Sequence, residues 1–383
     1  MSKVTFSLVG GQPFPVYAQA LDSEPDILVL FYSEQTERIA QNIEQCIKQK
    51  LPKTTVSKVL VDATNLKESS FTFNAYANAW LKPGNEVTVN LSGGTKPWSM
   101  QLLNIFAGKD NARCVFIDQN NYIWDMASYE RHKFEHTDIS LDDKFALYGV
   151  QVSQRTSIDV YDAQDLKAMC DVERLYRFHS KCFNDIVSKI EQDDKQGIFT
   201  GTYSSSNMLC HINRTGKDRF ECSFEKANTA HRVKLVIASP HASQLMLCSG
   251  WFELKVAKLL SQWYGARTVW LNTIINYPHS TDPINEIDVI VETTNDKLLF
   301  VECKTQVYAP TDVDKFNDVT KSYGGQGSKR IFFTHWSMKN VAQLKCDALR
   351  IPHYVFSEVA RDQLSIQSFF NALDKYMGTI NAR

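Results

Sequence analysis

The sequence predicts an α/β protein with an N-terminal doubly wound domain and a separate C-terminal α/β domain. Two observations predict this class: short apolar runs alternate with helical patterns through the first third of the chain, and an apolar hairpin with a charged end occupies residues 285–304. A chain of 383 residues is also long for a single hydrophobic core. We therefore expect a first domain at 1–140, a linker and helical or irregular connecting region at 141–245, and a second domain at 246–383.

The first domain is predicted from its alternation of strands and helices. The apolar runs that we expect to be strands are 4–9, 27–31, 56–61, 87–91, 114–117 and 122–124. Between them, apolar residues recur at helical spacing, at Ile39, Ile43 and Ile47 and at Trp98, Leu102 and Phe106. This βαβ pattern is typical of a mostly parallel sheet, in which ligands bind beyond the carboxyl ends of the strands.

Composition restricts the function classes. The chain is 43% hydrophobic and 22% charged, as in ordinary globular proteins, and its formal net charge of -1 provides no overall attraction to nucleic acid. Nine cysteines without a C-x-x-C pair, an N-terminus unlike a signal peptide and the lack of a long apolar run indicate a reduced, cytoplasmic setting without a membrane span. The cysteines and histidines lack the spacing of a zinc site.

One strand-to-helix turn has the composition of an anion site. It reads Ser92-Gly93-Gly94-Thr95-Lys96 and follows the predicted strand 87–91. Glycines let backbone amides approach a ligand, the helix N-terminus favours an anion, and Lys96 adds a full charge. Capping of the helix explains Ser92 and Thr95 equally well, but it does not require two glycines and a lysine. Neither a P-loop nor G-x-G-x-x-G is present, so ATP hydrolysis and a dinucleotide cofactor are not predicted.

This strand, turn and helix resemble the CARF domain, the CRISPR-associated Rossmann-like sensor of cyclic oligoadenylates. The resemblance covers about the first third of the chain and implies that residues 92–96 contact the ring phosphates. Weaker matches are the first ligand loop, Ser33, Gln35 and Thr36, and the glycine turn Gly10, Gly11 and Gln12. Because the ring carries phosphates in near symmetry, two copies of the site across a two-fold axis would match it. We therefore expect a homodimer.

The hairpin at 285–304 places charged residues at the end of two apolar strands. Residues 287–291 and 298–301 flank the turn-forming Asn295 and Asp296. If the turn uses residues 294–296, Asp288 lies opposite Glu302, and Lys304 points to the same face as Glu302. Two carboxylates and an amine on one face cost free energy unless a cation compensates them.

This cluster resembles the active site of the PD-(D/E)xK nuclease superfamily. The resemblance implies that Asp288 and Glu302 bind Mn2+ or Mg2+, and that Lys304 orients the attacking water or stabilises charge on the phosphate. The alternative is a solvated surface hairpin, because E-x-K is common by chance. The proline of the family motif is displaced to Pro283, and Glu286 shares the strand face of Asp288 as either an assisting residue or a solvated flank.

Glu253 is the fourth candidate of this site. It opens a predicted helix whose core positions include Phe252, Val256 and Leu260. By itself such a carboxylate is explained by the helix dipole. In the nuclease superfamily a glutamate at this place supports the metal, so the resemblance adds Glu253 to the metal and catalytic residues. The Gly-rich, basic loop at 322–330 is either a contact for a phosphodiester backbone or an ordinary connection.

Together the two resemblances imply a type III CRISPR ancillary effector in antiviral defence. In this interpretation cyclic tetra-adenylate, or the hexa-adenylate, binds the first domain of a homodimer and activates metal-dependent cleavage of DNA or RNA by the second. Two alternatives remain open from the sequence. One is a CARF-containing transcription regulator that binds nucleic acid without cutting it, and the other is a ring nuclease that degrades its own ligand.

Overall fold

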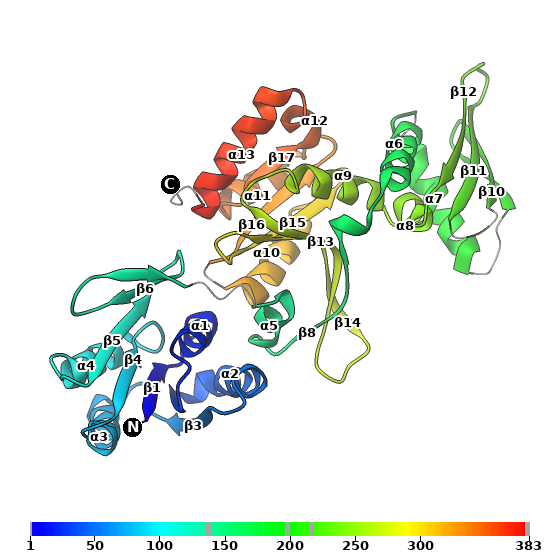
Figure 1. Cartoon of the computed structure of the whole chain (residues 1–383). Helices are drawn as coiled ribbons and strands as arrows, with labels where there is room; N and C mark the ends of the chain where they lie inside the picture. Colours follow the sequence, from blue (N-terminus) through cyan, green and yellow to red (C-terminus); the bar gives the residue numbers. More distant parts are fainter. Residues whose placement is uncertain are drawn as a thin grey trace.

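A computed structural model describes residues 2–134, 139–178, 180–195, 200–214, 216, 218–325 and 327–379 of the chain. Three sheets organise these residues, with seven, four and six strands. The seven-stranded sheet belongs to the first domain and the six-stranded sheet to the second (Figure 1). No helix among the described residues is long and apolar enough to cross a membrane.

The first domain is built on a sheet whose strand order is β3-β2-β1-β4-β5-β6-β7. The strands are β1 (Lys3–Leu8), β2 (Ile27–Tyr32), β3 (Thr55–Leu60), β4 (Glu86–Asn90), β5 (Ala112–Ile117), β6 (Tyr122–Asp125) and β7 (Arg131–Lys133). The first five are parallel, and β6 and β7 are antiparallel. The chain order reverses between β1 and β4, which is where such sheets bind ligands.

Helices cover both faces of this sheet, as the sequence predicts. Leu28 and Leu30 of β2 pack with α1 (Phe14–Ser23) and α2 (Glu37–Lys50). Val29 and Phe31, which point to the other face because side chains alternate along a strand, pack with α3 (Leu66–Trp80) and α4 (Lys96–Phe106). The doubly wound arrangement therefore follows from the buried alternation of β2.

The connecting region contains more regular structure than expected. After α5 (Leu141–Ala146), strand β8 (Gln151–Ser157) is the edge strand of the six-stranded sheet. After the short helix η2 (Ile158–Val160), three helices pack on one face of a four-stranded antiparallel sheet. The elements of this unit are α6 (Ala163–Phe178), α7 (Ser180–Lys195), β9 (Thr200–Ser205), β10 (Met208–Arg214), β11 (Arg219–Lys226), β12 (Arg232–Ala238) and α8 (Ala242–Leu247). Figure 1 shows this unit at the upper right, away from the first domain.

The second domain has a mixed sheet in the order β17-β16-β15-β14-β13-β8. Its elements are α9 (Gly250–Leu260), β13 (Ala266–Asn276), β14 (Pro283–Thr293), β15 (Leu298–Lys304), α10 (Pro310–Gly324), β16 (Lys329–Thr334), α11 (Asn340–Ala348), β17 (His353–Val355), α12 (Phe356–Val359) and α13 (Gln363–Met377). Leu299, Val301 and Cys303 of β15 share a core with α9, and Leu298 and Phe300 share the other core with α10. The two helices therefore lie on opposite faces of the sheet.

The hairpin β14–β15 has the register that the sequence predicts. Val289 pairs with Val301, and the same register continued by one residue sets Asp288 opposite Glu302. The amide of Thr293 donates to the carbonyl oxygen of Lys297 at 3.0 Å, which leaves residues 294–296 as the turn. Asp296 has a φ of 61°, as the last residue of a three-residue hairpin loop requires.

Candidate ligand cavity and candidate active site

Two glycine turns meet at the carboxyl ends of β1 and β4. A Cβ atom on Gly10 would lie 2.9 Å from the amide nitrogen of Gly94, and one on Gly93 would overlap the carbonyl oxygen of Leu8. Gly94 has a φ of 67°, a conformation that glycine adopts without strain. Gly10, Gly93 and Gly94 are therefore required by close backbone approach, whereas a Cβ on Gly11 would meet no atom within 4 Å. The approach brings the two predicted ligand loops together.

The hydroxyl groups of these turns mostly serve the fold. Ser92 Oγ accepts the amide of Ile117 at 2.8 Å, and Thr95 Oγ1 accepts the amide of Trp98 at 3.4 Å as the cap of α4. Ser33 and Thr36 form a capping box around a short helix, η1 (Glu34–Thr36). Capping, the simpler interpretation of Thr95, Ser33 and Thr36, is thus what the structure describes.

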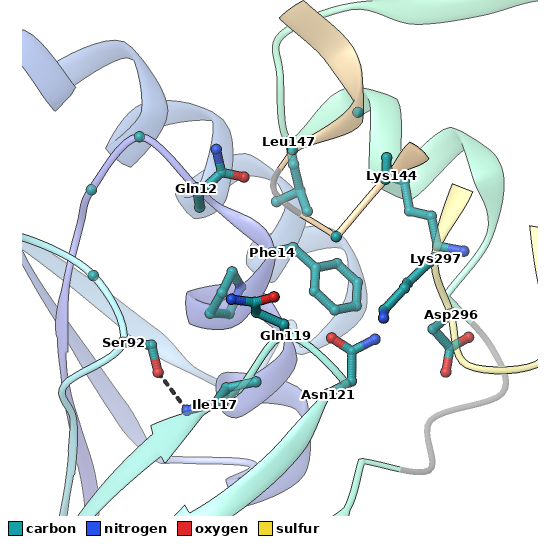
Figure 2. A pocket seen from close by; sticks show the side chains of 18 of the residues that line it. Gln12, Phe14, Ser92, Ile117, Gln119, Asn121, Lys144, Leu147, Asp296 and Lys297 are labelled. Carbon is teal, nitrogen blue, oxygen red and sulfur yellow. Dashed lines mark hydrogen bonds between the residues drawn. The ribbon is translucent and has the colours of Figure 1, made fainter. Parts of the chain in front are cut away.

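A cavity of about 610 Å³ opens beside the glycine turns (Figure 2). Of the residues predicted to bind the ligand, those that line it are Gly10, Gly11, Gln12, Ser92, Gly93 and Gly94. Those that do not line it are Ser33, Gln35, Thr36, Thr95 and Lys96. The predicted ligand set is therefore only partly brought together within one chain.

The second domain supplies the opposite wall of the same cavity. Lys297 of the hairpin turn, Tyr323 at the end of α10, and Gly325 of the loop that follows line it together with Lys144 of α5. The Gly-rich loop at 322–330 therefore faces the ligand cavity rather than the charged end of the hairpin; its Gln326 lies outside the described residues. Local sequence patterns carry no signal for this wall, because the contact joins residues that are far apart in the chain.

The charged end of the hairpin forms a second, smaller cleft of about 330 Å³. Asp288, Glu302 and Lys304 all line it, and Glu286 lies at its exposed side. The Lys304 ammonium lies 2.8 Å from Glu302 Oε1 and 3.7 Å from Asp288 Oδ2. The predicted cluster is therefore assembled, with both carboxylates near one cationic group.

Burial disfavours the ionised form of both carboxylates in this cluster. It raises the pKa of Glu302 to about 7, with the nearby Asp288 carboxylate adding to the effect and Lys304 opposing it. Burial also raises the pKa of Asp288, although Lys304 and the amide of Cys303, which donates to Asp288 at 2.8 Å, work against the shift. The pKa of Lys304 is raised because the two carboxylates outweigh its own burial. Lys304 therefore stays cationic at neutral pH, and either carboxylate gains from a further cation.

Glu253 stands apart from this cleft. It lies on α9, on the sheet face opposite α10, and it does not line the cleft. Its side chain is buried, and burial together with repulsion from Asp288 and Glu286 raises its pKa well above the ordinary value. The carboxylates of Glu253 and Asp288 therefore interact electrostatically. Direct participation of Glu253 in metal binding or catalysis remains a prediction.

The donor set fits a hard divalent cation held by two carboxylates. Within the described residues, no three His, Cys, Asp or Glu side chains converge to hold a metal ion. Asp288 and Glu302 nevertheless surround one positive charge, and Mg2+ is commonly bound by one or two carboxylates with waters and substrate phosphates completing its shell. The pair therefore suits a metal that binds together with a phosphodiester.

Lys315 is a residue of this cleft that sequence reasoning missed. It projects from α10, is exposed, and lines the cleft beside Phe316 and Val319 of the same helix. Its charge works against the burial that raises the pKa of both Asp288 and Glu302. Helix α10 follows the E-x-K strand and packs on the same face of the sheet as Leu298 and Phe300. A basic residue on the helix after that strand is the signal that would have suggested Lys315.

The fold and its two sites define an α/β protein with a Rossmann-like first domain and a later α/β domain that carries a carboxylate and lysine cleft. Residues 5–144 match the family model described as the Card1 CARF domain. The N-terminal domain is thus a CARF domain, and a second α/β domain follows it in the chain. This part of the predicted fold class is confirmed. A search of curated proteins found no match.

Solved structures share this fold over nearly the whole chain. Can2 from Sulfobacillus thermosulfidooxidans, in complex with cyclic tetra-adenylate, is 17% identical with a TM-score of 0.68, and the match covers 98% of this chain and 99% of that one. Protein VC1899 from Vibrio cholerae is 11% identical with a TM-score of 0.72 and 98% coverage of both chains. A type III CRISPR defence DNA nuclease activated by cyclic oligoadenylate is 16% identical with a TM-score of 0.56, covering 95% of this chain and 52% of that chain.

Proposed function

We propose that this protein is a cyclic-oligoadenylate-activated, divalent-metal-dependent nuclease of type III CRISPR defence that acts in the cytoplasm. The observation that carries the proposal is the convergence of Asp288, Glu302 and Lys304 in one cleft, in a chain whose first domain is a CARF domain. Support for the activator comes from Can2, a protein of the same fold bound to cyclic tetra-adenylate. Support for the reaction comes from the CRISPR defence DNA nuclease of the same fold.

The ligand is expected to bind beside the glycine turns of the first domain. Gly11, Gly93 and Gly94 line the cavity, and residues without a side chain let a ligand approach the backbone closely. Phosphates of cyclic tetra-adenylate are the expected partners of the backbone amides of these residues. Lys96 and Ser33, which lie outside the cavity of one chain, would contribute only if a second copy completes the site, as in the proposed homodimer.

In the cleft, each residue has a distinct chemical role. Asp288 and Glu302 would hold Mn2+ or Mg2+, which on binding supplies Lewis-acid activation of water and phosphate. Lys304, which both carboxylates hold beside the proposed metal position, would orient the attacking water and stabilise charge on the phosphate. Glu253 is proposed to support the site through water, because its carboxylate does not reach the cleft surface.

A cleavage panel tests the proposal. Single- and double-stranded DNA and RNA are incubated with Mn2+ or Mg2+ and with cyclic tetra- or hexa-adenylate. We expect cleavage of at least one substrate with ligand and metal together, and little without either. Glu302→Ala and Lys304→Ala, checked for folding, are each expected to lose about 100-fold or more of the activity. Undiminished cutting by either variant would contradict the assignment of the cleft.

The same panel separates the two alternatives. Retained nucleic-acid binding without cleavage under every condition would favour a regulator. Linear products from the cyclic ligand that persist in Asp288→Asn would place ring cleavage in the first domain.

A further inference from the structure

The hairpin that carries the catalytic candidates also reaches the ligand cavity with its turn. Asp296, Lys297 and Leu298 line the cavity, whereas Asp288 and Glu302 lie at the other end of the same two strands. We propose that Lys297 binds a phosphate of the cyclic ligand, so that both domains of the chain hold the ring. This inference rests on the proposed function, because it assumes that the cavity takes a cyclic oligonucleotide.

Among the described residues, Lys297 makes two hydrogen bonds through its ammonium group. Its side chain is buried, and its Nζ donates to Asn120 Oδ1 at 3.1 Å and to the carbonyl oxygen of Met377 at 2.9 Å. An ammonium group has three N–H donors, so one donor has no hydrogen-bond partner within the part of the chain that the structure describes. Figure 2 shows the side chain extending toward Phe14 and Asn121 at the cavity wall.

The charge of Lys297 is also less compensated than that of its neighbours. Lys144 pairs with Glu292 at 3.0 Å, and Arg267 pairs with Asp296 at 2.6 Å. Lys297, in contrast, has neutral oxygens as its hydrogen-bond acceptors and forms no ion pair with a described carboxylate. A buried charge is stabilised by a charged partner, and a phosphate entering the cavity would supply one.

The turn that carries Lys297 is held in place before any ligand binds. Asn121 Nδ2 donates to the carbonyl oxygen of Asn295 at 2.9 Å, and Asn295 Nδ2 donates to that of Met377 at 3.2 Å. Lys297 is therefore preorganised rather than recruited from solvent, which lowers the entropic cost of the contact.

Contact with Lys297 would act directly on the element that positions the catalytic carboxylates. Tyr323 provides a second connection between the ligand cavity and the cleft. It lines the cavity, and its hydroxyl accepts a hydrogen bond at 3.2 Å from Asn285, which lines the cleft. A ligand that binds one arrangement of the hairpin more tightly than another shifts the population toward it. Lys297 is thus a ligand-binding residue whose contact biases the active site.

Calorimetric titration of the full chain with cyclic tetra-adenylate and cyclic hexa-adenylate tests the inference. Lys297→Gln keeps donors for Asn120 and Met377 while removing the charge, and we expect about 10- to 100-fold weaker binding of the cognate ring. Lys297→Met removes the charge with a different side-chain shape and serves if the first variant does not fold. Lys297→Arg keeps the charge and is expected to bind within about fivefold of the wild type.

Asn295→Ala is the matched control, because Asn295 stabilises the same turn without lining the cavity. We expect it to bind nearly as the wild type does, with melting temperatures measured for every variant. If the wild type binds a ring and a folded charge-removing variant of Lys297 binds it equally well, the inference is overturned while the proposed ligand stands. An equal loss of affinity in Asn295→Ala would likewise overturn only the inference. Absence of binding by the wild type to either ring would overturn both this inference and the proposed ligand.

Discussion

Replacing Glu302 with glutamine should stabilise the metal-free protein above neutral pH. Burial and the neighbouring Asp288 raise the pKa of Glu302 from 4.5 to about 7, and its side chain is only 16% exposed. The folded state therefore holds the proton more tightly than the unfolded state, so wild-type stability falls as the pH rises from about 4.5 to 7 and is level above it. At about 1.4 kcal/mol for each pKa unit, the cost of ionising Glu302 in the folded protein is about 3 kcal/mol.

Urea unfolding in EDTA, measured from pH 4.5 to pH 8, provides the assay. The free energy of unfolding of Glu302→Gln relative to wild type should increase by about 3 kcal/mol over this range. Glu292→Gln on the same strand pair is the matched control with the opposite sign. Although burial opposes the shift, Lys144 and Trp270 hold the pKa of Glu292 below its usual value, so this variant should be destabilised at neutral pH and less so in acid. If Glu302→Gln follows the pattern of Glu292→Gln, the reasoning is refuted.

Three further predictions concern the turns, the cleft and the metal. Gly93→Ala should lower the melting temperature, at a cost of about 1–3 kcal/mol in stability, because its Cβ would overlap the Leu8 carbonyl oxygen. Gly11→Ala, whose Cβ would meet no atom within 4 Å, should leave the melting temperature unchanged. Equal melting temperatures of the two variants would contradict this explanation. Lys315→Ala should slow ligand-activated cleavage about tenfold at unchanged ligand affinity, with the exposed Lys321→Ala of the same helix as a control; equal rates in the two variants would remove Lys315 from the site. EDTA should abolish cleavage while leaving calorimetric binding of the cyclic ligand intact, and cleavage that survives complete metal removal would exclude the metal mechanism.

The parts of the fold that local patterns dictate were predictable from the sequence. The buried alternation around Val29 and Leu30 specifies a sheet covered on both faces, and the family match at residues 5–144 agrees with the domain so predicted. The register of the hairpin follows from the choice of a three-residue turn, which fixes every pair of residues along the two strands. The pairing of Asp288 with Glu302 is a consequence of that turn, so local sequence is enough to predict it.

The parts that depend on contacts between distant segments were not predictable. Strand β8 reads as a linker because its residues alternate only weakly, yet it completes the edge of a sheet formed more than 100 residues later. Lys297 lies in an ordinary polar turn, and its place in the ligand cavity comes from docking against Asn120. Thr36 and Thr95 take part in helix capping, and residues that suit an anion site also suit a helix cap, so local sequence does not separate the two roles.

The central claim is that ligand in the CARF domain permits cleavage in the Asp288 and Glu302 cleft. The most direct test follows cleavage of a quenched fluorescent DNA or RNA in Mn2+ by the wild type and by Asp288→Asn, with and without cyclic tetra- or hexa-adenylate. We predict that only the wild type with its cognate ligand cleaves, while Asp288→Asn binds the same ligand with unchanged affinity. Cleavage by the ligand-bound Asp288→Asn variant, or equal cleavage by the wild type with and without ligand, would contradict the claim.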